Sequence, residues 1–133
     1  MSEPVWYLDS SAIVKLVVEE RESRALMAWL EEAPVAVSCD LARVEVVRAV
    51  RPSGAAAVDR ARRVLGALTM LRLDDPLLER AGGLEPVTLR SLDAIHLAAC
   101  LTLGADLAGL VTYDARQAEA ATGLGLRVEA PAP

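Results

Sequence analysis

The sequence predicts an α/β fold in which a short parallel sheet is flanked by helices on both faces. Short apolar runs alternate with longer segments of helical periodicity along the 133 residues, which is typical of a parallel sheet. Apolar residues make up 53% of the chain and aromatic residues only 3%, so the core must be built from Ala, Leu and Val. Such a core suits close packing of helices on a sheet. The length fits a single domain over residues 1–133, with a tail at 131–133.

In the first half of the chain, two expected strands are followed by helical segments. The strands are short apolar runs at residues 5–8 and 35–37. Helices with apolar residues at intervals of three and four are expected over residues 12–17, 22–32, 41–50 and 55–68. We predict N-caps at Ser10 or Ser11 for the first helix and at Asp40 for the third. Pro34 is expected to end the second helix, and residues 51–54 form a turn.

The second half repeats this alternation. Strands are expected at residues 71–73, 107–112 and 126–129. Pro76 suits the first turn of a short helix that ends before Gly82. Ser91 is expected to cap a helix that runs to residue 103 and is stopped by Gly104. A last helix covers residues 115–122.

The charge balance bears on the kind of partner. The chain has 14 basic and 19 acidic residues, a formal net charge of −5. An acidic chain is a poor candidate for coating duplex DNA through phosphate neutralisation. A nucleic-acid substrate stays possible where bound cations mask a local cluster of acids.

Neither the cysteines nor the apolar segments indicate an extracellular or membrane protein. Cys39 and Cys100 are far apart and lack the spacing of a metal site, so we expect reduced, buried thiols. The opening residues lack the basic start and apolar stretch of a signal peptide. The most apolar window, residues 94–111, is interrupted by polar residues and glycine. We therefore expect a cytoplasmic protein without a membrane span.

Four acidic residues stand in otherwise apolar surroundings: Asp9, Glu45, Asp93 and Asp114. A carboxylate among core residues is costly unless it is paired, hydrogen-bonded or bound to a metal. One such acid is commonly a helix cap or a member of a buried ion pair. Four of them with few basic neighbours indicate a divalent cation, and oxygen ligands suit Mg²⁺ or Mn²⁺. This reasoning allows a metal-dependent nuclease or a phosphatase and does not choose between them.

Three segments resemble a known family. The segments are YLDSSAIVKL at 7–16, LRSLDAIHLAA at 89–99 and VTYD at 111–114, the last followed by Ala120, Ala121 and Gly123. They are similar to PIN-domain ribonucleases, specifically VapC-type toxins of bacterial toxin–antitoxin pairs. The segment LARVE at 41–45 matches the place of the family's second acid more loosely. The resemblance extends from about residue 5 to residue 131.

The resemblance implies a function and a set of site residues. It implies an endoribonuclease toxin that hydrolyses RNA with Mg²⁺ or Mn²⁺, is inhibited by a VapB-like antitoxin and forms a homodimer. The acidic site is expected to consist of Asp9, Glu45, Asp93 and Asp114. Ser11 and Thr112 occupy positions where the family often places a hydroxyl near the metal or its waters. A helix cap and a strand-end hydrogen bond are alternative roles for these two residues.

Other polar and aromatic residues have structural interpretations beside functional ones. His96 lies one helical turn from Asp93, so contact with the acidic site is one role, and packing in the core is the role that we expect. Trp6 and Trp29 are expected in the core or a dimer interface, with stacking on RNA bases as the alternative. Arginines expected on a solvated face or in contact with RNA phosphates are Arg60, Arg62 and Arg63. Arginines expected to bind substrate phosphate or to offset the carboxylates are Arg43, Arg90 and Arg116.

Two other classes of enzyme or signalling domain need motifs that this sequence lacks. An aspartyl-phosphate phosphatase needs Asp-x-Asp at the first strand, and Asp9-Ser10-Ser11 lacks it. A phosphorylated receiver domain needs an acidic pair in the first loop and a late lysine at a strand end, and neither is present. A catalytically degenerate PIN domain that acts only as a protein- or RNA-binding module is the remaining alternative. The presence of all four acids argues against it.

Overall fold

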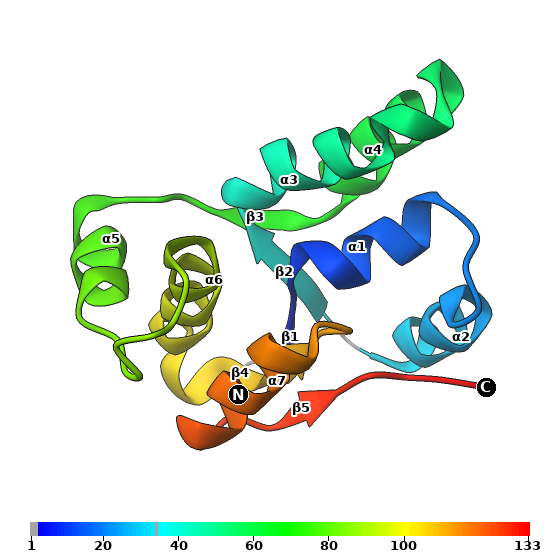
Figure 1. The fold of residues 1–133 in the computed structure, drawn as a ribbon. Coiled ribbons are helices and arrows are strands. Elements are labelled where there is room, and N and C mark those ends of the chain that lie inside the picture. Colours follow the sequence, from blue (N-terminus) through cyan, green and yellow to red (C-terminus); the bar gives the residue numbers. More distant parts are fainter. Residues whose placement is uncertain (1–2, 34) are drawn as a thin grey trace.

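The computed structural model describes residues 3–33 and 35–133 of the chain, which form a sheet with helices around it (Figure 1). The strands are β1 (Val5–Leu8), β2 (Val35–Cys39), β3 (Thr69–Leu71), β4 (Leu107–Val111) and β5 (Val128–Glu129). The α-helices are α1 (Ser10–Val17), α2 (Ser23–Glu32), α3 (Leu41–Val50), α4 (Ala55–Ala67), α5 (Asp75–Gly82), α6 (Ser91–Thr102) and α7 (Ala115–Gly123). Short 3-10 turns cover η1 (Arg51–Ser53) and η2 (Gly104–Asp106). Pro34, expected to end α2, lies outside the described residues.

The five strands form one parallel sheet in the order β3-β2-β1-β4-β5. The central strand β1 pairs with β2 on one side and with β4 on the other. Because the sheet is parallel, the carboxyl ends of all its strands lie at one edge, where ligands bind in open α/β sheets. The predicted fold class is confirmed.

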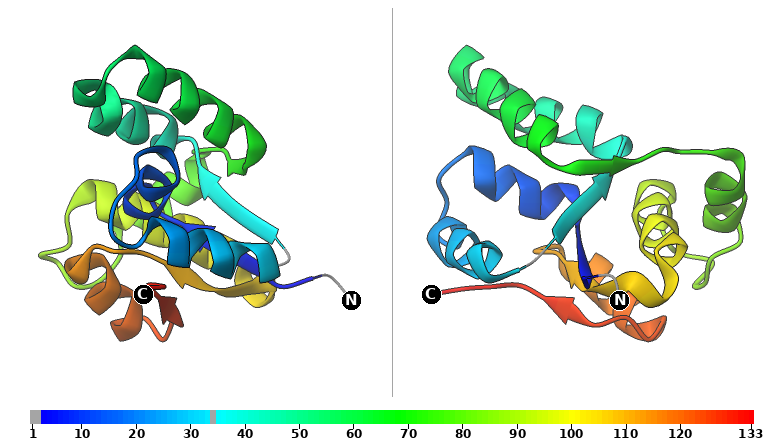
Figure 2. Two further views of the ribbon diagram at one scale, coloured as in Figure 1. Left: turned by 90° about the vertical axis from the view of Figure 1, so that its right-hand side faces the viewer. Right: turned by 180° about the vertical axis from the view of Figure 1, so that it is seen from behind.

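Side chains alternate between the two faces of the sheet and divide the core into two clusters. Trp6 and Leu8 of β1 pack with α1, α2, α3 and α4, whereas Tyr7 packs on the opposite face with α5, α6 and α7. Figure 1 shows α5 and α6 on one side of the strands and α1 and α2 on the other, and Figure 2 shows the same division from behind. Helices therefore cover both faces, as the sequence predicted.

Two of the expected helix caps are wrong, and a third lacks its side-chain hydrogen bond. Asp9 caps α1 by accepting a hydrogen bond from the backbone N–H of Ala12, so Ser10 and Ser11 are helical residues. Asp40 is the N-cap residue of α3, as predicted, but its side chain makes no capping bond and instead accepts from Arg43 Nε at 2.9 Å. Ser91 is the first residue of α6 rather than its cap.

The third strand also lies two residues earlier than expected. Ser38 of β2 pairs with Met70, and Cys39 pairs with Leu71. The chain then turns from β2 into α3, so no partner remains for residues after Leu71. The sequence predicted 71–73 because Leu71 and Leu73 are apolar, and both do pack in the core. Pairing with β2, rather than apolarity, fixes the strand.

Two further expectations agree with the structure. Cys39 and Cys100 are both buried free thiols. Within residues 3–33 and 35–133, no helix is long and apolar enough to cross a membrane.

Candidate active site

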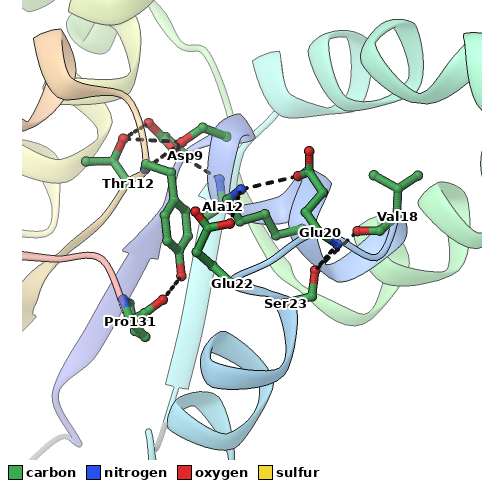
Figure 3. Close-up of polar contacts among 11 residues, drawn as sticks. Asp9, Ala12, Val18, Glu20, Glu22, Ser23, Thr112 and Pro131 are labelled. Atoms are coloured by element: carbon green, nitrogen blue, oxygen red, sulfur yellow. Dashed lines mark hydrogen bonds and ion pairs between the residues drawn. The ribbon is translucent and has the colours of Figure 1, made fainter. Parts of the chain in front are cut away.

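Asp9 follows β1 at the carboxyl edge of the sheet, and its carboxylate is only 4% exposed. Two hydroxyls donate hydrogen bonds to this carboxylate: Ser11 to Oδ1 at 2.6 Å and Thr112 to Oδ2 at 2.5 Å (Figure 3 shows the Thr112 contact). Burial raises the pKa of Asp9, and the hydrogen bonds from Ser11 and Thr112 oppose this rise without cancelling it. Asp9 therefore sits in a site that disfavours an isolated negative charge.

Ser11 and Thr112 also join the ends of β1 and β4. Ser11 Oγ accepts a hydrogen bond from the Tyr113 backbone N–H at 2.9 Å. Thr112 Oγ1 accepts one from the Asp114 backbone N–H at 3.1 Å. Each hydroxyl thus donates to Asp9 and accepts from the chain that follows β4. The predicted proximity of both hydroxyls to the acidic site is observed, and the strand-end hydrogen bond is present as well.

Glu45 projects from α3 and is held by two neighbours. Ser10 Oγ donates to Glu45 Oε1 at 2.7 Å, and His96 Nε2 lies 2.7 Å from the same oxygen. Burial tends to raise the pKa of Glu45, but the hydrogen bonds from His96 and Ser10 outweigh it and lower the pKa. Glu45 is therefore an ionised carboxylate in a fixed orientation.

Asp93, in the first turn of α6, has no hydrogen bond to its carboxylate within the described residues. Burial raises its pKa first, and the negative charge of Asp114 raises it further. The charges of His96 and Arg90 oppose this, while the charge of Glu45 adds to it. These effects require the acids to lie near one another although they come from different elements.

Asp114 precedes α7 and also caps it. Its Oδ1 accepts hydrogen bonds from the backbone N–H groups of Arg116 at 2.9 Å and Gln117 at 3.3 Å. Gln117 in turn donates from Nε2 to the Asp93 carbonyl at 3.4 Å, which ties α7 to the start of α6. The cap interpretation thus holds for Asp9 and Asp114, and it does not exclude a second role at the sheet edge.

The carboxylate oxygens of these acids are chemically suitable ligands for a divalent cation. The described residues contain no preassembled group of three His, Cys, Asp or Glu side chains that could hold a metal ion. In the described part of the chain, no lysine or arginine forms an ion pair with Asp9, Asp93 or Asp114. Carboxylates that lack a cationic partner are suitable oxygen ligands for Mg²⁺ and Mn²⁺. The residues therefore fit such an ion.

His96 combines the two roles that the sequence offered for it, packing in the core and contact with the site. It is 3% exposed, which confirms that it packs in the core. Its ring also bridges the site: Nδ1 lies 2.7 Å from the Tyr7 hydroxyl, and Nε2 contacts Glu45. Because a carboxylate only accepts, Nε2 donates to Glu45, and Tyr7 donates to Nδ1 when the ring is neutral. The spacing of three residues from Asp93 was the available signal, since it places both on one helix face.

The structure assigns different roles to the aromatic and basic candidate residues. Trp6 and Trp29 pack edge to face with ring centroids 4.7 Å apart, and Trp6 is buried, which favours the core interpretation. Arg60 donates from Nε to the carbonyl of Val17 at 3.0 Å, so it connects α4 to α1. Arg62 and Arg63 are exposed on α4, as a solvated face requires.

Comparison with known proteins identifies the family. The sequence model of the PIN domain family matches residues 6–123. The chain belongs to the PIN domain family. This PIN domain is 53% identical over 125 residues to Ribonuclease VapC46 of Mycobacterium tuberculosis, covering 94% of the chain and 96% of that relative.

Two solved structures share the fold of this PIN domain. The crystal structure of Mycobacterium tuberculosis VapC20, a Sarcin-Ricin loop cleaving toxin, has a TM-score of 0.74 at 15% identity and covers 92% of this chain and 96% of that one. A toxin–antitoxin complex from Klebsiella pneumoniae contains a chain with a TM-score of 0.71 at 21% identity, covering 94% of this chain and 96% of that one. At these identities the likeness concerns the fold.

Proposed function

We propose that this PIN domain is a Mg²⁺- or Mn²⁺-dependent endoribonuclease that acts as the toxin of a toxin–antitoxin pair. The observation that carries the proposal is that Asp93 lies near the negative charges of Asp114 and Glu45, and that no described lysine or arginine forms an ion pair with Asp93 or Asp114. The identity to a VapC ribonuclease over almost the whole chain supports RNA as the substrate. We infer a cytoplasmic location from this substrate.

The four acids are the proposed ligands of the ion. Ser11 and Thr112 hold the Asp9 carboxylate in place, and His96 and Ser10 hold Glu45. Asp114 lies close enough to Asp93 for its negative charge to raise the pKa of Asp93. A bound divalent cation would lower the pKa of a water molecule for attack on phosphorus and stabilise charge on the leaving oxygen.

The test is cleavage of single-stranded RNA by the purified protein with Mg²⁺, with Mn²⁺ and with EDTA. We expect cleavage only with metal, and a loss of roughly 100-fold or more in Asp93→Asn because a carboxylate ligand is removed. Asp75→Asn, an exposed acid in the first turn of α5, is the matched control and should cleave like wild type. Cleavage that survives both EDTA and Asp93→Asn would contradict the proposal.

The same assay distinguishes the alternative function. A catalytically degenerate PIN domain would bind RNA or a protein without cutting RNA under any metal condition. Metal-dependent cutting that is abolished by Asp93→Asn excludes this alternative.

An antitoxin partner is the second part of the proposal. A lysine or arginine of the antitoxin, inserted among the carboxylates, would neutralise the charge that the described residues leave uncompensated. Expression of this PIN domain alone should arrest growth, and co-expression of the antitoxin encoded beside it should restore growth. A structure of the inhibited complex that leaves Asp9, Glu45 and Asp93 open to solvent would contradict occlusion.

We also propose that two copies associate into a homodimer. Large apolar side chains remain exposed in the single chain, including Val44 of α3 at 58% and Leu92 of α6 at 50%. Light scattering of the protein as it elutes from a size-exclusion column should give twice the 14.1 kDa mass of the chain. A mass equal to one chain at micromolar concentration contradicts this part.

A further inference from the structure

A cavity of about 670 Å³ opens beside Asp93, between the loop that leads into α6 and one face of α7. Its volume lies within the range of roughly 300–1,000 Å³ that is typical of small-molecule sites. From α7, the residues Arg116, Glu119 and Gly123 reach the cavity at helical spacing, so a single face of this helix forms one wall. The preceding loop and the start of α6 form the other wall.

Two arginines line the cavity beside the acidic site. Arg90 precedes α6, and its charge lowers the pKa of Asp93, which requires the two side chains to be near each other. Arg116 stands on the facing helix and is exposed. Guanidinium groups bind phosphate oxygens through paired hydrogen bonds. The arginines are therefore placed to hold a phosphate of a nucleotide whose neighbouring phosphodiester lies at Asp93.

The remaining lining suits a nucleobase. Leu89 and Leu124 are half-buried and, with Pro86, provide an apolar surface against which a base can pack. Glu85 and Glu119 are exposed carboxylates, which can only accept hydrogen bonds when ionised. Guanine alone among the four RNA bases presents two adjacent N–H donors, N1–H and N2–H, to a single carboxylate.

Building on the proposed ribonuclease activity, we propose that this cavity binds a guanine nucleotide adjacent to the cleaved phosphodiester. Arg90 and Arg116 bind its phosphate, and Glu85 or Glu119 accepts from its Watson–Crick edge. Leu89 and Leu124 pack against the base. The cavity then decides where in an RNA the acidic site cuts.

Gly123 offers a clean way to fill the cavity. A Cβ at Gly123 meets no heavy atom within 4 Å, and Gly123 lines the cavity, so we expect a leucine there to occupy part of it. Gly66 on α4 is the matched control, because a Cβ there also meets no atom within 4 Å and this helix does not line the cavity. Both variants replace a helical glycine by leucine, but only Gly123→Leu changes the lining of the cavity.

The first experiment measures binding without catalysis. Guanosine 5′-monophosphate and uridine 5′-monophosphate are titrated into the metal-free protein and followed by the backbone amide signals in NMR. We expect the guanine nucleotide to bind roughly tenfold more tightly, with signals shifting at Leu89 and Gly123, and Gly123→Leu to weaken it roughly tenfold. Gly66→Leu should bind like wild type. Equal binding of the two nucleotides, or unaltered binding by Gly123→Leu, overturns the proposal.

The second experiment sequences the ends produced from a randomised single-stranded RNA. We expect guanine to be enriched at one position next to the cut for wild type and Gly66→Leu, and the enrichment to disappear for Gly123→Leu. Unchanged base preference in Gly123→Leu overturns the guanine subsite and leaves the ribonuclease function intact. Selective guanine binding without metal-dependent cutting of any RNA supports the cavity and overturns the ribonuclease function.

Discussion

At the scale of single residues, His96 connects the core to the acidic edge of the sheet. Its two ring nitrogens contact the Tyr7 hydroxyl from β1 and the Glu45 carboxylate from α3, both at 2.7 Å. Burial lowers the pKa of His96, but its contacts with Cys39 and Glu45 outweigh burial and raise the pKa. A buried ring with both nitrogens partnered has one orientation, so His96 fixes where Glu45 points.

This arrangement predicts a cost for Tyr7→Phe. The substitution removes the hydroxyl that partners His96 Nδ1 and leaves the nitrogen buried with only Cys39 Sγ at 3.9 Å. We expect the free energy of unfolding to fall by about 1–2 kcal/mol in urea titrations. Tyr113→Phe is the control, because its hydroxyl donates to the Pro131 carbonyl at 2.7 Å in a half-buried position, and it should cost less, about 0.5–1 kcal/mol. An equal fall in the free energy of unfolding in the two variants would show that the contact with His96 contributes no more than an ordinary half-buried hydrogen bond.

At the scale of elements, glycine at position 109 lets β4 pack against its neighbours. A Cβ on Gly109 would lie 2.6 Å from Trp6 Cζ3 and 2.8 Å from the Arg127 carbonyl oxygen. Neither neighbour can move freely. Trp6 packs on Trp29, and the Arg127 carbonyl accepts a hydrogen bond from the Leu110 backbone N–H at 2.8 Å.

We therefore expect Gly109→Ala to destabilise the protein by about 1–3 kcal/mol through overpacking. Gly66→Ala, on α4 with open space around the new methyl group, should instead stabilise it by about 0.5–1 kcal/mol because alanine is the better helix former. Thermal unfolding of both variants checks the pair. A neutral Gly109→Ala would mean that β5 shifts away at little cost.

The junction of α1 and α2 is held by two ion pairs of Lys15, with Glu20 at 3.3 Å and with Glu22, and the pair with Glu22 has a predictable pH dependence. Lys15 Nζ lies 3.1 Å from Glu22 Oε1 and 4.8 Å from the centre of the Tyr113 ring (Figure 3 shows Glu22 beside this junction). The hydrogen bond from Lys15 lowers the pKa of Glu22 from its ordinary 4.5. A lowered carboxyl pKa stabilises the folded protein above the ordinary value, and this stabilisation is lost as the pH falls through the lowered value.

Glu22→Gln should therefore lower the unfolding temperature at pH 7, and the difference from wild type should close as the pH falls below 4.5. Glu31→Gln, an exposed acid of α2 that forms no ion pair within the described residues, should leave the unfolding temperature unchanged at every pH. Scanning calorimetry between pH 3 and pH 7 gives both comparisons. A Glu22→Gln deficit that persists at the acidic end contradicts the ion-pair explanation.

At the scale of the whole molecule, the acidic edge links metal binding to folding. Asp9→Asn keeps an oxygen that can cap α1 and removes a buried charge, so without metal its stability should lie within about 1 kcal/mol of wild type or above it. A cation at a hundred times its dissociation constant should add about 2.7 kcal/mol to wild type. The variant lacks one proposed ligand and should gain much less.

Thermal unfolding with EDTA and with excess Mn²⁺ measures both effects. Asp75→Asn serves as the control and should gain as much from Mn²⁺ as wild type does. Equal gains in Asp9→Asn and wild type would show that Asp9 is not a ligand. A loss of several kcal/mol in Asp9→Asn without metal would show that Asp9 is mainly structural, because the amide cannot accept hydrogen bonds from both Ser11 and Thr112 as the two carboxylate oxygens do.

Much of this molecule could be predicted from local patterns. Apolar runs and helical periodicity identified the alternation of strands and helices, since each depends on residues within about one turn or one strand. The positions of the caps were less predictable, because neighbouring Asp and Ser side chains compete for the same backbone N–H groups. In the structure, Asp9 makes the capping hydrogen bond, and Ser10 and Ser11 do not.

The sequence by itself therefore determined the fold class, the family pattern and the four candidate acids. Only the tertiary structure decided which residues meet. The contact of His96 with Glu45 joins positions 51 residues apart, and that of Thr112 with Asp9 joins positions 103 apart. Strand order and the position of β3 likewise depend on pairing with β2 and not on any local signal. Such contacts depend on the tertiary arrangement of the chain, because hydrogen bonds and burial act between residues that are neighbours in space. Sequence periodicity gives information only about residues that are neighbours in sequence.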